Sequence, residues 1–264
     1  HRAAPIQVYW LGYPFTTGIP EVDYILLDSF YKPENRDWVS EKPLVMPESW
    51  VCFDSFEPEP INDKLPVERN GVITFGTFNN TYKFTREVVA TWAAIMRRVP
   101  RSRFFIVRPH IASPTVCTNI TKEFGRHGIG PERLYLIDNR RVGLSHFSFY
   151  DEIDISLDTF PLTGGTTTCD SIWMGVPCVT LVGPSLHQRI SYALLNHVGA
   201  GELCAATTEE YVDLAAALAN DIGSLREYRH GFRPALLASP LCQGERFARN
   251  FEATIERAAA ENGI

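Results

Sequence analysis

Two glycines and three hydroxyl side chains stand together at residues 164–168, within Pro161-Leu-Thr-Gly-Gly-Thr-Thr-Thr-Cys-Asp170. Residues 153–158 before them have the composition of a strand, and residues 170–174 after them that of a helix. The unpaired N–H groups and the positive dipole end of a helix start, together with hydroxyls, favour an anion such as phosphate. A plain Gly-rich loop with a threonine N-cap has the same pattern, so this loop alone leaves both interpretations open.

Two charged side chains can complete such an anion site. Lys83 ends the segment Phe75-Gly-Thr-Phe-Asn-Asn-Thr-Tyr-Lys83, which follows an expected strand, and its ammonium can neutralise a diphosphate. One charge-assisted hydrogen bond contributes about 1.5–3 kcal/mol, and more where the charge of a leaving group develops. The alternative is an exposed lysine at a helix start. Asp170, one turn into the helix after the threonines, can hydrogen-bond a ribose hydroxyl beside the phosphates.

His146 begins the helix that is expected before the strand at 153–157, where its ring can pack against a nucleotide base. A histidine at a helix start with nothing bound is an equal alternative. The sequence contains no Asp-x-Asp pattern and no His/Cys cluster with metal-ligand spacing. We therefore expect no metal in the site, with Lys83 and the helix amides in its place.

Alternating strands and helices from residue 72 onward must position these residues. The expected strands are Val72–Phe78, Arg103–Val107, Leu134–Ile137, Ile153–Leu157 and Cys178–Val182. The expected helices are Thr85–Arg97, Thr118–His127, Ser145–Asp151, Thr168–Met174, Leu186–Asn196 and Glu209–Asn220. This alternation predicts an α/β domain with a Rossmann-like parallel sheet covered on both faces. Such sheets bind ligands at the carboxyl ends of their strands, here the loops after Phe78, Ile137, Leu157 and Val182.

The first 66 residues differ from this pattern. Strands are expected at Ile6–Leu11 and Val22–Leu27, and the Pro- and Glu-rich segment Glu57–Pro66 is typical of a linker. Two short strands cannot bury a core alone, so we expect residues 1–66 to be the tail of another lobe and its linker, and residues 67–264 to form the main domain. The last helix is expected at Gly244–Ala260, with an apolar face that includes Phe247 and Phe251.

Composition limits the class of protein. The 264 residues are 45% hydrophobic and 21% charged, which is typical of a soluble globular chain. A net charge of -6 disfavours a general nucleic-acid surface. No apolar run approaches the length of a bilayer span, and no signal segment opens the chain. Six cysteines without a C-x-x-C pair favour a reducing compartment, so a cytoplasmic or nucleocytoplasmic protein is expected.

Five motifs together resemble the catalytic region of the protein O-GlcNAc transferases and SPINDLY-type proteins, the glycosyltransferases of family 41 with a GT-B fold. The motifs stand in the order of that family and span nearly the whole chain. They are Trp10-Leu-Gly-Tyr-Pro-Phe-Thr-Thr-Gly18, Phe75-Gly-Thr-Phe-Asn-Asn80 with Lys83, Asp154-Ile-Ser-Leu-Asp-Thr-Phe-Pro161, Gly164-Gly-Thr-Thr-Thr-Cys-Asp170 and Met174-Gly-Val-Pro-Cys-Val-Thr180. The resemblance implies that the chain is the carboxyl-terminal lobe of a GT-B glycosyltransferase with the tail of the amino-terminal lobe.

The resemblance assigns roles to individual residues. Lys83 matches the catalytic lysine on the donor diphosphate, and Asn80 lies beside it. Asp170 matches the carboxylate that binds the ribose, and His146 the histidine that packs on the base. The phosphate-binding helix start corresponds to Gly165, Thr166, Thr167 and Thr168. The loop that lines the sugar and the reacting centre corresponds to Leu11, Gly12, Tyr13 and Pro14.

The implied reaction is inverting transfer of GlcNAc from UDP-GlcNAc to Ser or Thr hydroxyls of proteins, without a metal or other cofactor. Gly165 departs from the O-GlcNAc transferases, which place a histidine there, and the Thr-Thr-Thr-Cys run is more similar to the SPINDLY branch, whose plant enzymes use GDP-fucose. Asp170, where plant SPINDLY has Glu, favours UDP-GlcNAc. Protein O-fucosyl transfer and a non-catalytic nucleotide-sugar-binding module remain the alternatives.

The resemblance also implies partners. The donor and protein acceptors would bind the chain, and neither nucleic acid nor a membrane is expected. Most of the amino-terminal lobe and the tetratricopeptide repeats that recruit acceptors would be absent from these residues, so the chain alone can bind donor and still be inactive. In a GT-B fold the helix at Gly244–Ala260 would cross back onto the amino-terminal lobe and leave its apolar face partly uncovered.

Overall fold

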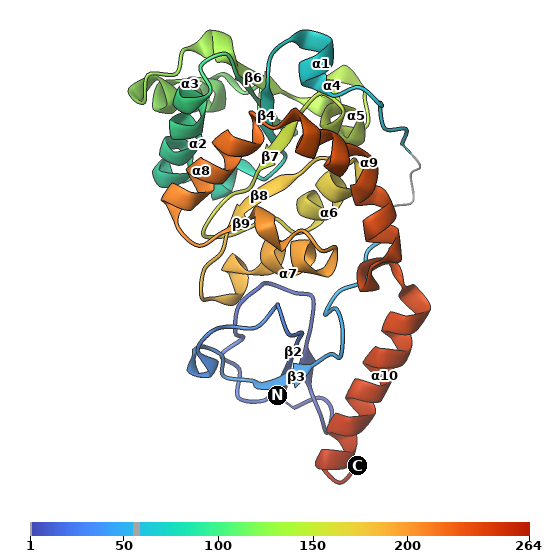
Figure 1. Cartoon of the computed structure of the whole chain (residues 1–264). Helices are drawn as coiled ribbons and strands as arrows, with labels where there is room; N and C mark the ends of the chain where they lie inside the picture. The colour runs from blue at the N-terminus through green and yellow to red at the C-terminus, as the bar shows by residue number, and fades with distance from the viewer. Residues whose placement is uncertain (1, 55–58) are drawn as a thin grey trace.

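A computed structural model, which describes residues 2–54 and 59–264, contains two parallel sheets, one above the other in Figure 1. The larger sheet has six strands in the order β6-β5-β4-β7-β8-β9. Its strands are β4 (Thr74–Thr77), β5 (Arg103–Val107), β6 (Leu134–Ile137), β7 (Ile155–Leu157), β8 (Cys178–Leu181) and β9 (Cys204–Ala205). In chain order this arrangement is 3-2-1-4-5-6, the doubly wound order of dinucleotide-binding folds. The predicted Rossmann-like sheet is therefore confirmed.

Helices cover both faces of this sheet (Figure 1). Those between its strands are α2 (Arg86–Arg98), α3 (Pro114–Arg126), α4 (Asn139–Val142), α5 (His146–Tyr150), α6 (Thr166–Trp173) and α7 (Ile190–His197). The others in this part of the chain are α1 (Pro66–Asn70), α8 (Thr208–Leu218) and α9 (Ile222–Ala238). The sequence did not predict α9, whose interior contains Gly231 and Pro234. Each of these residues disfavours a helix interior, so tertiary packing must override local preference there.

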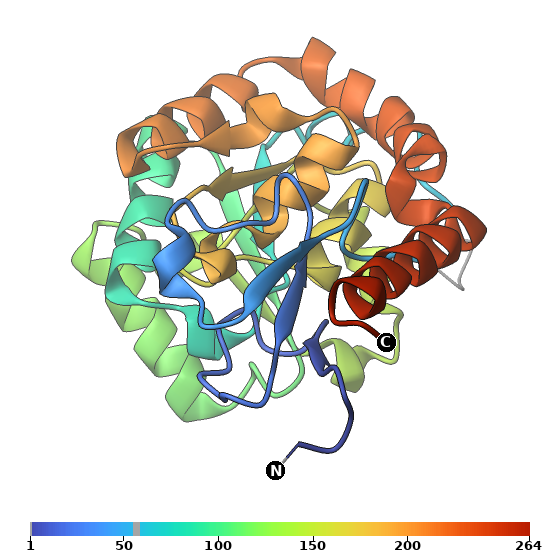
Figure 2. The same cartoon turned by 90° about the horizontal axis from the view of Figure 1, so that it is seen from below.

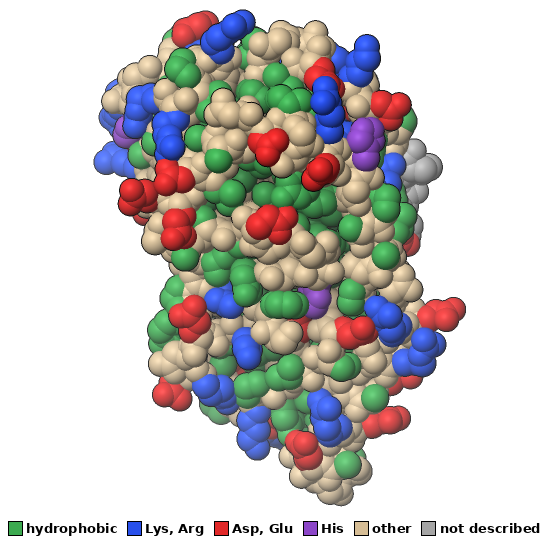
Figure 3. All heavy atoms as spheres, in the orientation of Figure 1, with side chains coloured by type: hydrophobic (Ala, Val, Ile, Leu, Met, Phe, Trp, Pro, Cys, Tyr) green, Lys and Arg blue, Asp and Glu red, His purple; other side chains and the backbone are tan. Residues whose placement is uncertain are grey.

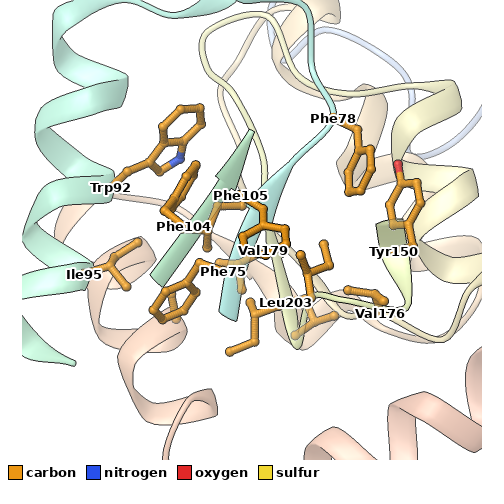
Figure 4. Close-up of a cluster of buried hydrophobic side chains, with 14 of the residues drawn as sticks. Phe75, Phe78, Trp92, Ile95, Phe104, Phe105, Tyr150, Val176, Val179 and Leu203 are labelled. Atoms are coloured by element: carbon orange, nitrogen blue, oxygen red, sulfur yellow. The ribbon is translucent and has the colours of Figure 1, made fainter. Parts of the chain in front are cut away.

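Large apolar side chains fill the space between the larger sheet and its helices, as Figure 4 shows. Phe75 on β4 and Phe104 on β5 are fully buried, and the ring of Trp92 on α2 lies 5.1 Å from that of Phe104. The helical spacing of apolar residues on α2 predicted this face correctly, since Val88 and Ile95 are buried with Trp92. Each such side chain contributes about 1.5–3 kcal/mol through burial. This core holds the strand ends, and the loops after them, in fixed positions.

The smaller sheet consists of β1 (Val8–Tyr9), β2 (Tyr24–Leu27) and β3 (Lys42–Val45), all parallel. The sequence did not predict β3, because Lys42 and Pro43 are poor strand residues, and Pro43 is tolerated only at a sheet edge. Helix α10 (Gly244–Glu261) leaves the larger domain and packs along this sheet, as Figures 1 and 2 show. The predicted crossing of the last helix is thereby confirmed.

The apolar face of α10 directly contacts residues of the first 66, the segment that contains the smaller sheet. The indole of Trp10 stacks on Phe247 at 5.9 Å and lies 5.1 Å from the ring of Phe251, measured between ring centroids. Tyr24 and Leu44 of the smaller sheet and Met46, directly after β3, are buried in the same cluster. Phe247 and Phe251 are half-buried, so the helix covers the sheet while its own face stays partly open.

The predicted linker lies against the larger domain where the structure describes it. Residues 57 and 58, the first two of that segment, lie outside the described residues. Beyond them, the amide of Asn62 donates to Asp151 Oδ1 at 3.1 Å, and Leu65 is buried. The segment therefore docks along the domain instead of spanning open solvent. The domain boundary at residue 66 stays a prediction.

The surface mixes charges of both signs. Figure 3 shows acidic and basic side chains interspersed over one face of the molecule. At the end of α2, Arg98 pairs with Asp213. The guanidinium carbon of Arg103 lies 5.1 Å from the centroid of the Phe105 ring and 5.6 Å from that of Tyr135. Arg103 therefore packs against aromatic rings and is only partly exposed. Within residues 2–54 and 59–264, no helix combines the length and apolar character needed to cross a membrane.

Candidate functional site

The candidate site lies at the carboxyl ends of β4 and β7, the adjacent strands where the doubly wound order reverses. The chain leaves β4 through Phe78 into a short 3₁₀ helix at Thr81–Lys83. It leaves β7 through residues 158–165 and enters α6 at Thr166. Hydrogen bonds join these two loops, so the sheet brings Lys83 and the threonines together as the sequence predicted.

A buried carboxylate shapes the loop before α6. Asp158, directly after β7, is 1% exposed. Its Oδ1 accepts the amides of Thr159 and Gly164, each at 2.8 Å, and its Oδ2 accepts the hydroxyl of Thr180 at 2.7 Å. The carboxylate therefore folds the loop back toward the strand end. The sequence does not reveal this role of Asp158, because the path of the loop cannot be predicted from it.

The two glycines of the loop have different reasons to be there. A Cβ on Gly164 would lie 2.4 Å from Thr168 Oγ1, closer than side chains tolerate, and 3.1 Å from Asp158 Oδ1, a tight contact. A Cβ on Gly165 would meet only Ile190 Cγ2, at 3.7 Å, an ordinary contact. The structure thus requires glycine at 164 and leaves room for a side chain at 165. Gly165 is the residue that lines a cavity.

The start of α6 offers donors to an anion. As the first residues of the helix, Thr166 and Thr167 have N–H groups with no acceptor inside it, and their side chains are not fully buried. Thr168 differs, because its side chain is buried, its hydroxyl lies 2.8 Å from Ser191 Oγ, and its amide donates to the Gly165 carbonyl. Thr168 therefore fixes the helix start, and the predicted contact of its hydroxyl with a ligand does not fit this geometry.

Lys83 lies against this helix start. Its Nζ donates to Asn79 Oδ1 at 2.9 Å and to the Thr163 carbonyl at 2.8 Å. Burial lowers the pKa of Lys83, and the nearby charge of Asp158 opposes that shift while Arg108 adds to it. An ammonium has three donors, so one N–H remains for a ligand. The geometry suits a cation that contacts a phosphate.

The side chain of Asn79, and not that of the predicted Asn80, contacts the ammonium of Lys83. Asn80 precedes the 3₁₀ helix, where its carbonyl accepts the Lys83 amide at 3.0 Å and its side chain makes no capping hydrogen bond. Asn79 is buried and bonds to both Lys83 and Asp158. The sequence signal was ambiguous because both asparagines follow the same strand, and only the loop path decides which one faces inward.

One cavity, of about 350 Å³, lies over the ends of β4 and β5 beside α6. His146 and Asp170 both line it, with His146 Nε2 3.3 Å from Asp170 Oδ2. Asp170 is buried and His146 is almost half exposed, so a polar group can reach both. The full lining is Phe78, Val107, Arg108, Pro109, Asn139, Arg140, His146, Thr166, Thr167 and Asp170.

Two arginines of this cavity were not predicted. Arg108 follows β5 and donates to the Phe78 carbonyl at 3.1 Å, which fixes its side chain over the loop after β4. Arg140 lies on α4. Position at the strand end was the available signal for Arg108, in the same way as for Lys83. Both arginines add positive charge to a cavity next to a helix start, which favours an anionic ligand.

A second cavity, of about 380 Å³, lies between the smaller sheet and α6 and α7. Leu11, Gly12, Tyr13 and Pro14 line it from one side, as predicted, and Gly165 and Thr166 from the other. The loop is held by the hydroxyl of Tyr9, which donates to the Tyr13 carbonyl at 2.6 Å, and by Trp10 Nε1, which donates to the Trp50 carbonyl at 2.8 Å.

Leu11 carries the strain of this loop. Its φ of 56° lies in the left-handed region, which costs a residue other than glycine about 1–3 kcal/mol.

Thr166 lines both cavities, so the start of α6 stands between them. Over the described ranges 2–54 and 59–264, no group of three or more His, Cys, Asp or Glu side chains has metal-binding geometry. Metal-free chemistry stays a prediction.

The model of glycosyltransferase family 41 matches residues 1–57 and 63–251. The chain belongs to glycosyltransferase family 41. Barley SPINDLY, described as a probable UDP-N-acetylglucosamine–peptide N-acetylglucosaminyltransferase, is 42% identical over 257 residues, which cover 95% of this chain and 27% of that protein. The SEC protein of Arabidopsis thaliana, with the same description, is 29% identical over 95% of this chain and 26% of its own length.

A solved structure gives the same family picture. The O-GlcNAc transferase of Thermobaculum terrenum, solved as a mutant, superposes with a TM-score of 0.87 and 28% identity, over 99% of this chain and 49% of that one. The resemblance drawn from five motifs and the GT-B fold class are therefore confirmed. The family-41 chain spans about a quarter of the length of the curated relatives that it matches.

Proposed function

We propose that this family-41 chain is the donor-binding lobe of an enzyme that transfers GlcNAc from UDP-GlcNAc to Ser or Thr hydroxyls of proteins, with inversion and without a metal. The observation that carries the proposal is the hydrogen bond from Lys83 to the loop before α6, because Thr166, the first residue of that helix, lines both cavities. The descriptions of the barley and Arabidopsis relatives support the choice of sugar and acceptor.

In this proposal the donor lies across the start of α6. Its diphosphate accepts hydrogen bonds from Lys83 Nζ and from the Thr166 and Thr167 amides, in the manner of anions at helix starts. Its nucleoside occupies the cavity lined by His146 and Asp170, where the carboxylate accepts a ribose hydroxyl. Arg108, which lines the same cavity, adds positive charge that attracts the diphosphate.

The sugar then occupies the cavity lined by residues 11–14. The oxygen of an acceptor hydroxyl attacks the anomeric carbon from the face opposite the diphosphate. The bond between that carbon and the diphosphate oxygen breaks, and the hydroxyl proton is released to solvent. Negative charge grows on the departing diphosphate, next to Lys83. A preorganised cation there stabilises the transition state more than the ground state, which is the condition for a faster reaction.

We further propose that the rest of the amino-terminal lobe and tetratricopeptide repeats of the same protein complete the enzyme and recruit its acceptors. A cytoplasmic or nucleocytoplasmic location fits the proposed acceptors. The smaller sheet supplies the contact surface for that lobe, because β1 and β3 are its two edge strands. Edge strands carry unpaired backbone groups that a further strand can satisfy.

A transfer assay with the full-length protein tests the proposal. UDP-GlcNAc and GDP-fucose are offered separately with an acceptor peptide, with and without EDTA, and mass spectrometry identifies the added sugar. We expect GlcNAc addition that EDTA does not reduce, a product of opposite anomeric configuration by NMR, and a loss of at least about a hundredfold in rate for Lys83→Ala. Lys122→Ala, at an exposed lysine on α3, is the matched control.

Two results would contradict the proposal. Fucose addition without GlcNAc addition would assign the other donor. Wild-type turnover by the Lys83→Ala variant would remove the assigned role of the lysine, whichever sugar is transferred.

A further inference from the structure

A buried side-chain chain links Asp158 to Lys83 through one asparagine. Asn79, 5% exposed, donates from Nδ2 to Asp158 Oδ1 at 3.1 Å. Its Oδ1 accepts Lys83 Nζ at 2.9 Å. The orientation of the amide follows from its neighbours, because an ionised carboxylate only accepts hydrogen bonds and an ammonium only donates them.

The same carboxylate oxygen sets the loop on the other side of the site. Asp158 Oδ1 also accepts the Gly164 amide at 2.8 Å, which fixes the turn before α6. The Thr163 carbonyl, one residue earlier, is the second acceptor of Lys83 at 2.8 Å. Thr167 Oγ1 lies 3.5 Å from Asn79 Oδ1 at the helix start. Both groups expected on the diphosphate therefore depend on one buried carboxylate.

We propose that Asp158 is the positioning residue of the phosphate site: it holds the Gly164 turn directly and holds Lys83 through the side chain of Asn79. This inference rests on the proposed function, in which Lys83 and the start of α6 bind the donor diphosphate. In this proposal Asp158 itself does not contact the donor, since its side chain is 1% exposed and its oxygens accept the Asn79 amide, the Gly164 amide and the Thr180 hydroxyl.

Charge is the second part of this role. Burial lowers the pKa of Lys83, and the charge of Asp158 acts against that shift. The uncharged amide of Asn79 lies between the Asp158 carboxylate and the Lys83 ammonium. The carboxylate therefore attracts the ammonium through this amide and not through a direct ion pair. Asp158 therefore favours the charged form of Lys83, whose ammonium has a third N–H beyond the two that the protein accepts.

Asn79→Ala tests the link, because it removes both hydrogen bonds of the amide and leaves Asp158 in place. Thr74→Val is the matched control, since Thr74 is buried at the opposite end of β4 and its hydroxyl accepts Arg103 Nε at 2.8 Å. Asp158→Asn is a second variant that removes the charge. Differential scanning calorimetry checks that each variant folds.

Two readouts separate a positioning role from a structural one. Competitive acetylation with mass spectrometry measures the titration of Lys83 against the exposed Lys42 and Lys122 in the same chain. Calorimetry measures UDP affinity between pH 7 and pH 10. We expect Asn79→Ala and Asp158→Asn to lower the pKa of Lys83 and to weaken UDP binding about ten- to a hundredfold at alkaline pH, while Thr74→Val changes neither.

The inference is overturned if Lys83 titrates alike in wild type and Asn79→Ala, even when the wild type binds UDP and the proposed function stands. It is upheld if the Lys83 titration moves in Asn79→Ala although the wild type binds no nucleotide, in which case the proposed function fails alone. Should Asp158→Asn not fold, Asn79→Ala and the wild-type titration still decide.

Discussion

Gly164→Ala adds one methyl group at the most crowded point of the proposed phosphate site. The new Cβ would lie 2.4 Å from Thr168 Oγ1, 2.9 Å from Thr167 Oγ1 and 3.1 Å from Asp158 Oδ1. The Thr168 hydroxyl cannot simply rotate away, because it is buried and lies 2.8 Å from Ser191 Oγ. The loop itself must therefore move away from Asp158 and stretch the hydrogen bond of its amide.

Overpacking of this kind costs about 1–3 kcal/mol. For a chain of this size we expect the melting temperature to fall by roughly 2–10 °C. We also expect UDP affinity to fall about tenfold, because the displaced loop carries the Thr163 carbonyl that holds Lys83. Differential scanning calorimetry and isothermal titration with UDP measure the two effects on the same samples.

Gly165→Ala is the control one residue away. Its new methyl group would meet only Ile190 Cγ2, at 3.7 Å, so we expect smaller losses in both measurements. Equal losses for the two alanine variants would refute the account, since the crowding at 164 would then not be what limits the loop. Wild-type affinity in Gly164→Ala would refute it as well.

Three further predictions test other parts of the structure. Burial raises the pKa of Asp154 from 3.8 to about 6, so the stability that its protonation gives is full below pH 4 and is lost as pH rises through 6. Over that window, urea titrations should show the free energy of unfolding falling by roughly 3 kcal/mol less in Asp154→Asn than in wild type. Parallel pH curves for the two proteins would contradict this. His197→Ala leaves the buried Asp28 carboxylate without the ring nitrogen that lies 2.7 Å away, and it should lower the free energy of unfolding by about 3 kcal/mol. A decrease of less than about 1 kcal/mol would show that the pair contributes little. Asp170→Asn should weaken UDP binding about tenfold in calorimetry and leave pyrophosphate binding unchanged, whereas an equal loss for both ligands would argue against a ribose contact.

The larger sheet could be predicted because most of its strands are rich in apolar, aromatic and β-branched residues and alternate with helical patterns. The bounds of β5 and β6 agree residue for residue with the expectation. Short or irregular elements could not be predicted in this way. Strand β9 has two residues, and β3 contains Lys42 and Pro43, so neither produces a clear pattern.

The candidate site was predictable where it depends on strand ends and not where it depends on loop paths. Lys83 meets the start of α6 because β4 and β7 are neighbours in a doubly wound sheet. The inward turn of Asn79 instead of Asn80, and the burial of the Thr168 hydroxyl, follow from side-chain contacts that no spacing rule contains. The roles proposed for these residues came from the family resemblance and not from their spacing.

The central claim is that Lys83 and the start of α6 hold a nucleoside diphosphate, and calorimetric titration of UDP into this chain tests it most directly. We expect one UDP to bind per chain, at least about tenfold more weakly to Lys83→Ala than to wild type, with Lys122→Ala unchanged. A wild-type chain that binds no UDP, or a Lys83→Ala variant that binds it as tightly as the wild type, would contradict the claim.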